Sequence, residues 1–266
     1  MAAAIRPDID QLAAFARDAI LRCGQRANRF YRDVRPHERF DEGLVTAAEL
    51  ELTALFQQLL YDTFPAHRIF GADQNADGYT HDPGRYLWIF DPIDGLDNFQ
   101  AGIPVWAMSL SLMENHWPLF GMIHLPVTGD LFHARAGGEA FSGSHRLDPQ
   151  ATQSAEEERL ILTFSRFHRH YRTVFPGKIR NLGCTAAHLC YVAMGRADAA
   201  IVTNESFKDL AAAEVIVEAA GGKIFTMDGT PFHAGEYLNG EKIAAHLIAT
   251  RPDHLDAILS YLERID

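Results

Sequence analysis

The chain of 266 residues is 47% hydrophobic and 22% charged, which is enough apolar material for a substantial core in one domain or two closely fused lobes. A formal net charge of −11 argues against nucleic-acid partners, since these generally require a basic face. There is no apolar run near the roughly 18 residues of a membrane helix, so we expect no membrane partner. We see no secretory signal and therefore expect a cytoplasmic protein. The three cysteines lack paired CxxC spacing, so we expect reduced thiols.

Apolar spacing predicts two helices and then an antiparallel sheet in the first half of the chain. Apolar positions recur with helical period over residues 9–31 and 44–64. Short apolar runs separated by turn residues predict strands at 69–70, 86–90, 105–113, 119–125, 131–135 and 140–141. We therefore expect an N-terminal α+β lobe over residues 1–152 that contains an antiparallel meander.

A charged stretch at residues 152–159 separates this pattern from an alternating one. The predicted elements that follow are strands at 160–163, 199–202, 223–225 and 246–249, and helices around 189–194, from 207 and from 254. Such alternation is typical of an α/β layer. We expect a C-terminal α/β lobe over residues 153–266, so the fold class of the whole chain is α/β (α+β).

Two carboxylates follow the second predicted strand. Asp91 and Asp94 lie three residues apart, where they repel each other unless a cation or protons neutralise them. Mg²⁺ prefers hard oxygen ligands, and the carbonyl of Ile93 could lie beside both acids. Gly95 permits a close turn, and a helix start at Leu96 would offer amide hydrogens to a phosphate. The alternative is an acidic surface turn, because such pairs are common at exposed turns.

Another acid opens an alanine-rich helix. Residues 207–220 predict this helix, which the glycine pair Gly221-Gly222 ends cheaply in the left-handed conformation. Asp209 falls in the first turn, where the helix dipole favours an anion. Small side chains beside it let the helix approach a sheet. Taken alone, the pattern is also typical of an ordinary capped core helix.

Together, these segments resemble the inositol monophosphatase family, which belongs to the magnesium-dependent, lithium-sensitive phosphatases. The family's DP-I-D-G-T and W-D-x-A-A…A-G-G segments are similar to residues 91–96 and 208–222. A third segment, R-S-x-G-S-A-A-L-x-L-C-Y-V-A-x-G-R-x-D-A, is similar to residues 180–199. The resemblance covers nearly the whole chain and implies a layered α-β-α-β-α sandwich of the inositol monophosphatase and fructose-1,6-bisphosphatase type, with metal ions between the lobes.

The resemblance also implies a phosphatase that uses Mg²⁺ and a metal-activated water on a small phosphorylated alcohol. The implied metal ligands are Asp91, Ile93, Asp94 and Asp209. The implied substrate contacts are Gly95, Leu96, Gly183, Cys184 and Thr185. A thiolate of lowered pKa at Cys184 is an alternative to simple packing of that side chain. Because relatives commonly pair through the exposed face of the meander, a homodimer is implied as well.

Four positions depart from the family motifs. Ala72 stands where a glutamate ligand of the catalytic metal is expected, and a methyl group cannot bind Mg²⁺. Leu96 stands where a threonine helps to position the attacking water, but leucine has no hydroxyl. Lys208 replaces a tryptophan, and Val202 aligns with an acid that contacts inositol in several relatives.

Two interpretations of these departures compete. In the first, Asp73 takes the place of the missing glutamate and Asp97 or Glu49 orients the water, so that weakened phosphomonoesterase activity survives with Asp73, Asp91 and Asp94 as the catalytic acids. In the second, the aspartates retain one metal while the site of the nucleophile is lost. The protein would then bind a phosphorylated ligand without turnover, or act as an interaction protein.

Overall fold

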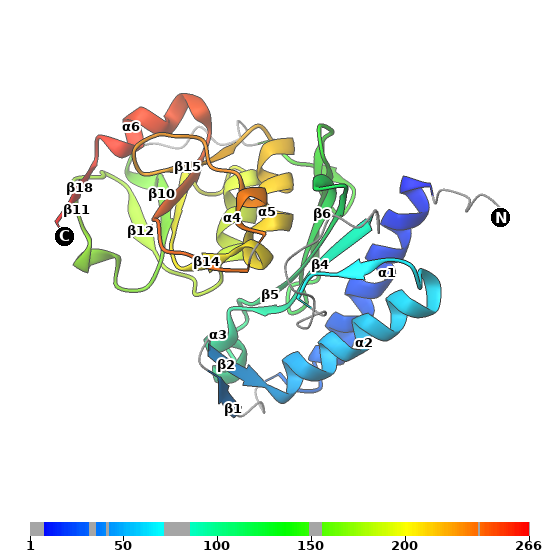
Figure 1. Ribbon diagram of the computed structural model, residues 1–266. Coiled ribbons are helices and arrows are strands. Elements are labelled where there is room, and N and C mark those ends of the chain that lie inside the picture. Colours follow the sequence, from blue (N-terminus) through cyan, green and yellow to red (C-terminus); the bar gives the residue numbers. More distant parts are fainter. Residues whose placement is uncertain are drawn as a thin grey trace.

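The computed structural model describes residues 8–31, 36–40, 43–71, 86–148, 156–238 and 240–265, which form five layers (Figure 1). A helix pair covers one face of a seven-stranded sheet, and two central helices lie between this sheet and a five-stranded sheet. A short helix packs on the outer face of the second sheet. The expected α-β-α-β-α sandwich is therefore confirmed.

The outer helix layer comes from the start of the chain. Helix α1 (Ile9–Ala27) begins after the N-cap Asp8 and packs against α2 (Ala47–Thr63). Both helices bury one face against the large sheet. Two helices were predicted here, but the predicted start at residue 44 is wrong, because residues 43–46 pair with another strand. That hairpin consists of β1 (Pro36–Phe40) and β2 (Gly43–Thr46).

The seven-stranded sheet contains the predicted meander. In spatial order its strands are β3 (Arg68–Ile69), β4 (Tyr86–Asp94), β5 (Ala107–Glu114), β6 (Trp117–Leu125), β7 (Asp130–Arg135), β8 (Ala140–Ser142) and β9 (His145–Arg146). From β4 onward each strand is antiparallel to the next, whereas β3 is parallel to β4. Trp88 and Phe90 face the outer helix pair, and Leu87 and Ile89 face the central helices, as a period of two requires.

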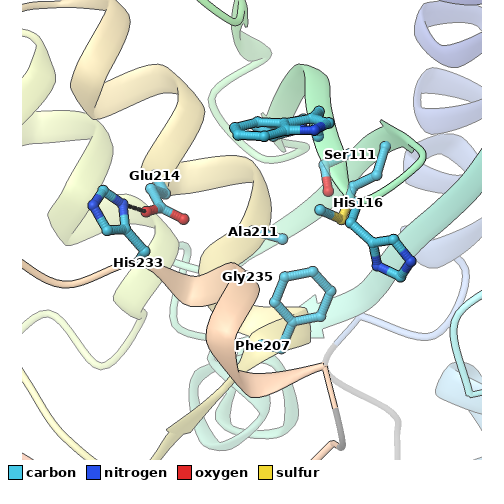
Figure 2. Close-up of a pocket in the computed structure, with 10 residues that line it drawn as sticks. Ser111, His116, Phe207, Ala211, Glu214, His233 and Gly235 are labelled. Carbon is cyan, nitrogen blue, oxygen red and sulfur yellow. Dashed lines mark hydrogen bonds and ion pairs between the residues drawn. The ribbon is translucent and has the colours of Figure 1, made fainter. Parts of the chain in front are cut away.

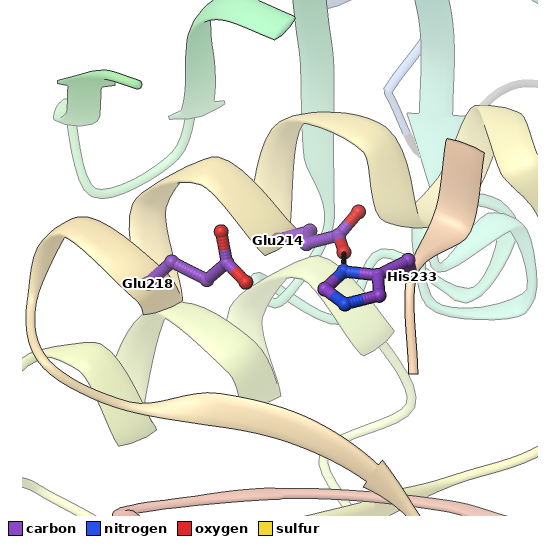
Figure 3. A group of neighbouring side chains, drawn as sticks. All are labelled: Glu214, Glu218 and His233. Atoms are coloured by element: carbon purple, nitrogen blue, oxygen red, sulfur yellow. Dashed lines mark hydrogen bonds and ion pairs between the residues drawn. The ribbon is translucent and has the colours of Figure 1, made fainter. Parts of the chain in front are cut away.

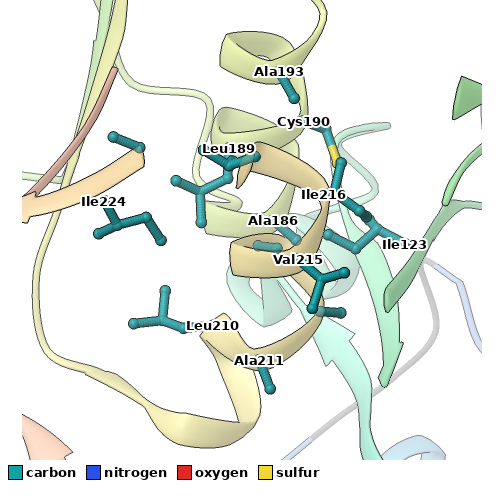
Figure 4. Close-up of a cluster of buried hydrophobic side chains, with 14 of the residues drawn as sticks. Ile123, Ala186, Leu189, Cys190, Ala193, Leu210, Ala211, Val215, Ile216 and Ile224 are labelled. Carbon is teal, nitrogen blue, oxygen red and sulfur yellow. The ribbon is translucent and has the colours of Figure 1, made fainter. Parts of the chain in front are cut away.

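The central layer consists of α4 (Thr185–Ala193) and α5 (Phe207–Ala219), which pack on each other and on both sheets (Figure 4). Their apolar side chains join one buried cluster that reaches Ile123 on the first sheet and Ile224 on the second. Gly121 lies on β6 directly below α5, where an added Cβ would come within 2.4 Å of the Ala212 carbonyl oxygen. The small residues predicted to permit a close approach therefore do so.

The second sheet is mixed. In spatial order its strands are β12 (Lys178–Arg180), β10 (Leu160–Thr163), β13 (Ala199–Val202), β17 (Leu247–Thr250) and β15 (Lys223–Thr226). Strand β10 is parallel to both of its neighbours, and β17 is antiparallel to both of its own. Ile161, Ile201 and Ile248 face outward and pack against α6 (Leu255–Leu259). Four of the five strands and the last helix were predicted, whereas β12 was not.

The remaining elements are short. They are α3 (Leu96–Ala101), η1 (Glu156–Glu158), η2 (Phe167–Arg169), η3 (Ala234–Tyr237), η4 (Pro252–His254), the pair β11 (Tyr171–Thr173) and β18 (Leu262–Arg264), and the pair β14 (Glu205–Ser206) and β16 (Lys242–Ile243). A lobe boundary near residue 152 stays a prediction. Side chains from both halves of the chain join the same central cluster, so the core itself does not mark a boundary. Within the described ranges, none of the helices combines the length and apolarity needed to cross a bilayer.

The contact between β6 and α5 predicts that Gly121→Ala destabilises the fold. The new methyl group meets backbone atoms that no side-chain rotation can move, so the free energy of unfolding should fall by about 1–3 kcal/mol. Urea denaturation measures this change. Gly235→Ala is the control, because an added Cβ there meets nothing within 4 Å. Equal unfolding midpoints for the two variants would contradict the close approach of α5 to the sheet.

Candidate active site

An irregularity in β4 brings the first two predicted acids to one face of the sheet. Asp91 pairs with Ser109, but Asp94 pairs with Ala107, so three steps along β4 match two steps along β5. In a regular strand, residues three apart point to opposite faces, and the extra residue of a bulge returns them to the same face. Pro92 lies within this bulge, where a missing N–H is tolerated. Both carboxylates therefore face the central helices.

The start of α5 presents the third acid to the same place. Asp209 Oδ2 accepts hydrogen bonds from the Ser206 N–H at 2.7 Å and from its hydroxyl at 2.9 Å. These bonds hold Asp209 in the first turn of α5, as predicted. The charge of Asp91 contributes to the raised pKa of Asp209, second to burial. Acids from two distant segments of the chain thus meet between β4 and α5.

The two predicted substrate segments pack against each other. Gly95 and Gly183 both have positive φ values, 83° and 75°, which favour glycine. A Cβ on Gly95 would lie 3.0 Å from the Gly183 carbonyl oxygen. Asn98 joins the segments by donating to the carbonyl oxygens of Val105 at 2.6 Å and Leu182 at 2.7 Å. The turn after β4 and the turn before α4 therefore form one structural unit.

The residues after Gly183 support Asp94. Asp94 Oδ2 accepts hydrogen bonds from the Ala186 N–H at 2.5 Å and from the Cys184 thiol at 3.2 Å. Burial, and then the charge of Asp94, raise the pKa of Cys184 well above its ordinary value. Cys184 is therefore a buried thiol that positions Asp94, and the alternative of a thiolate with lowered pKa is wrong.

Glu205 is a further buried acid that the sequence analysis missed. Its Oε1 accepts a hydrogen bond from the Thr185 hydroxyl at 2.7 Å. Burial, followed by the charges of Asp94 and Asp209, raises the pKa of Glu205 well above its ordinary value. The available signal was an acid four residues before Asp209, just ahead of a capped helix. The group formed by Asp91, Asp94, Asp209 and Glu205, which we call the crevice, thus contains more acids than the motifs indicate.

Repulsion and burial dominate the electrostatics of this crevice. Burial, followed by the charge of Asp91, raises the pKa of Asp94 to about 7, and Asp209 contributes in the same direction. The chain itself supplies one cation, because Lys208 Nζ lies 3.0 Å from Asp91 Oδ1. The side chain of Asp91 is only 4% exposed and that of Lys208 is 36% exposed, so the carboxylate of this ion pair is shielded from water while the lysine is partly solvated.

The donor set fits a hard divalent cation. Asp91, Asp94 and Asp209 each use one carboxylate oxygen in the contacts above, which leaves, within the described residues, a second oxygen on each for a metal. Three carboxylates and the Lys208 ammonium have a formal charge of minus two. Excess carboxylate oxygens of this kind are the ligands that Mg²⁺ prefers. Ile93 lies in the bulge between the first two acids and is buried.

The side chains of Leu96, Asp97 and Val202 do not join the three aspartates. Leu96 packs against the core cluster of the outer helix pair, and Asp97 is exposed in the first turn of α3. Val202 is buried within β13. Ala72 and Asp73 lie outside the described residues, so the catalytic role of Asp73 stays a prediction.

A separate cavity of about 180 Å³ lies beside α5 (Figure 2). None of the predicted site residues lines it. At its edge, Glu214 Oε1 lies 3.3 Å from His233 Nδ1, and one ligand atom each from Glu214, Glu218 and His233 fall within 4.8 Å of one another (Figure 3). Burial raises the pKa of Glu214 to about 7, and its other oxygen accepts the Ala234 N–H at 3.1 Å. These contacts explain the geometry of Glu214 without a ligand.

A buried histidine holds the turn that precedes α4. His188 is 2% exposed, and its Nε2 accepts the Leu182 N–H at 3.0 Å. Burial lowers the pKa of His188 from 6.5 to about 4. The neutral ring is therefore the form that supports this turn.

This shift predicts a contribution of His188 to acid destabilisation. Below pH 6.5 the unfolded chain takes up the proton first, so the contribution of His188 to stability falls from pH 6.5 to about pH 4 and then levels off. Each pKa unit corresponds to about 1.4 kcal/mol. His188→Gln can still accept through its amide oxygen but does not titrate, so its stability should fall less with acidification. Urea denaturation at pH 7, 6 and 5, with the exposed His145→Gln as control, tests this. Identical pH slopes for wild type and His188→Gln would refute the role.

Comparisons with known proteins agree with this fold. Residues 8–265 match the family model described as the inositol monophosphatase family. An inositol-1-monophosphatase of Bacillus subtilis (strain 168) is 32% identical over 198 residues, which is 71% of this chain and 74% of that protein. A structure of an IMPase from Thermotoga maritima superposes with a TM-score of 0.76 at 24% identity, covering 95% of this chain and 96% of that chain.

A second solved structure carries a ligand. It is described as a dual specific IMPase/NADP phosphatase bound with D-inositol-1-phosphate, and it superposes with a TM-score of 0.77 at 20% identity, covering 96% of each chain. The two structures establish the shared fold, and the match over residues 8–265 establishes the lineage. The chain therefore belongs to the inositol monophosphatase family.

Proposed function

We propose that this protein is a Mg²⁺-dependent phosphomonoesterase that hydrolyses a small phosphorylated alcohol such as inositol monophosphate. The observation that carries the proposal is the convergence of Asp91, Asp94 and Asp209 in one crevice, where burial and like charge favour a bound cation. Membership of the family supports the reaction class. The inositol phosphate bound to a solved relative supports the substrate class.

The proposed metal ligands are the three aspartates and the carbonyl oxygen of Ile93. When bound, Mg²⁺ would supply electrophilic activation of the phosphate ester and of a water molecule. Asp94 is held in place by the Ala186 N–H and the Cys184 thiol, so its free oxygen has a restricted position. We assign the backbone N–H groups of Gly95 and Leu96 to the phosphate oxygens.

The substrate alcohol is assigned to the turn before α4. Gly183 and Thr185 belong to the unit that also holds Gly95, which supports a pocket beside the phosphate position. Thr185 donates its hydroxyl proton to Glu205, and the second carboxylate oxygen of Glu205 could accept a hydrogen bond from a substrate hydroxyl. This assignment would compensate for Val202, which is buried and apolar.

The proposed activity is weaker than that of a family member with all motif residues. Asp73 would replace the glutamate that is absent at Ala72, and Glu49 or Asp97 would orient water. The charge of Asp91 is the main cause of the raised pKa of Lys208, and Glu49 contributes less, so Glu49 lies toward the crevice, whereas Asp97 is exposed on α3. This difference supports Glu49 for the role. Loss of a single positioning or electrostatic group typically lowers kcat about 100- to 1000-fold.

The second candidate function is metal-dependent binding of a phosphorylated ligand without turnover. Two observations favour it. Leu96 packs into the apolar cluster and offers no hydroxyl, and the ammonium of Lys208 already engages Asp91. In this case the crevice would keep its metal and its anion but lack a positioned nucleophile.

The proposed quaternary state is a homodimer in the cytoplasm. Of three aromatic side chains on or near the meander, Trp106 and Phe120 are buried in the core, whereas Trp117 is 76% exposed. An exposed tryptophan is a common anchor of protein interfaces and supports pairing through this face.

The enzyme hypothesis predicts slow, Mg²⁺-dependent release of phosphate from inositol 1-phosphate, measured by colorimetric phosphate detection. Asp94→Asn should lower kcat/KM about 100- to 1000-fold, because it removes a charged ligand from the crevice. The double change Ala72→Glu with Leu96→Thr should raise kcat/KM, because it restores a carboxylate and a hydroxyl at two positions where this chain differs from the family motifs.

The control for this experiment is Asp256→Asn, an exposed aspartate on the outermost helix. Wild-type protein and the double variant should be compared on a panel of inositol and sugar phosphates. Absence of phosphate release by both proteins rules out the enzyme hypothesis. Mn²⁺ binding that is nevertheless lost in Asp94→Asn would then favour the binding function.

A further inference from the structure

The contact between Lys208 and Asp91 is unusual for a phosphatase crevice built from carboxylates. Lys208 is the second residue of α5, directly before the metal-ligand candidate Asp209. Its Nζ lies 3.0 Å from Asp91 Oδ1, within charge-assisted hydrogen-bond distance. The lysine side chain is 36% exposed, so Lys208 reaches Asp91 from the edge of the acid group.

The surroundings of this ammonium resemble those of a bound cation. Asp91 on β4 is its contact, and the charges of Asp209 on α5 and Glu49 on α2 also act on it. Three carboxylates from three different elements thus favour a positive charge at one point. A lysine ammonium is a compact point charge, which makes it the side chain closest in character to a small cation.

The charge balance limits how many metal ions can join this lysine. Asp91, Asp94 and Asp209 together with Lys208 have a formal charge of minus two, which one divalent ion neutralises. Glu205 adds little to this balance, because burial and the neighbouring charges raise its pKa well above its ordinary value and so favour its neutral form. A second divalent ion beside Asp91 would face the ammonium across a shielded site and be repelled by it. Asp94 and Asp209 are held by hydrogen-bond donors from Ala186, Cys184 and Ser206 and are not paired with Lys208, so their free oxygens can take the single ion.

We propose that Lys208 is a built-in cation that takes the place of one metal ion beside Asp91. The crevice would then bind a single divalent ion through Asp94 and Asp209, and Asp91 would leave the ligand set given above because the lysine occupies it. The inference rests on the proposed metal-dependent function, which it deepens. Lys208 would also stabilise the fold in the absence of metal, because its ammonium neutralises the buried Asp91.

The test is the number of Mn²⁺ ions bound per chain, measured by electron paramagnetic resonance and isothermal titration calorimetry on the full chain. Wild type and Lys208→Arg, which keeps the charge, should each bind one Mn²⁺. Lys208→Met, which keeps the length of the stem but removes the charge, should bind two. Lys223→Met on β15 is the matched control and should behave as wild type.

Thermal unfolding gives a second readout that does not depend on activity. In EDTA, Lys208→Met should have a lower Tm than wild type, because Asp91 loses its partner, and Mn²⁺ should raise the Tm of this variant more than that of wild type. Two Mn²⁺ ions bound to wild type with the same affinities as to Lys208→Met would overturn the inference alone. Absence of Mn²⁺ binding in every form would overturn the proposed function together with it.

Discussion

The structure depends on a concentration of buried negative charge between β4 and α5. The bulge at Pro92 turns Asp91 and Asp94 to the same side, and the close approach at Gly121 brings α5 with Asp209 onto that side. Burial, followed by the charge of Asp91, raises the pKa values of Asp94 and Asp209 and so disfavours their ionisation. The fold can keep this arrangement only if cations, protons or hydrogen-bond donors compensate the repulsion.

Much of the surrounding architecture supplies that compensation. The turn before α4 donates a backbone N–H and a thiol to Asp94, and the residue before α5 donates twice to Asp209. His188 accepts the N–H of Leu182, and Asn98 donates to the carbonyl oxygen of Leu182. These two bonds fix the turn before α4. The chain's own donors therefore hold the acids in position, and such fixed positions favour tight metal binding and electrostatic catalysis.

Sequence reasoning predicted the layers well, because each buried element carries its own period. Strand β4 alternates between two cores, and α5 has alanine where it meets Gly121 of the sheet. It failed at residues 43–46, which were assigned to the start of the following helix, and at β12, whose three residues are too few to show a period. Both segments are defined as strands by their pairing, with β1 and with β10 respectively.

The site was predicted in part for the same reason. The motif acids Asp91, Asp94 and Asp209 stand out by spacing, but their common face follows from a strand register that no spacing reveals. Glu205 was missed because its burial depends on Thr185, which comes from another segment. The sequence identified Lys208 only as a residue that differs from the family motif. Its pairing with Asp91 could not be predicted, because it arises from the tertiary contact between α5 and β4.

The central claim is that acids from two distant segments share one divalent ion. Anomalous scattering from crystals soaked in Mn²⁺ tests it most directly. The result we predict is one peak within about 2.0–2.3 Å of carboxylate oxygens of Asp94 and Asp209, with Lys208 still paired to Asp91. Carboxylates of Asp91, Asp94 and Asp209 that point apart, with no peak between them, would contradict the claim.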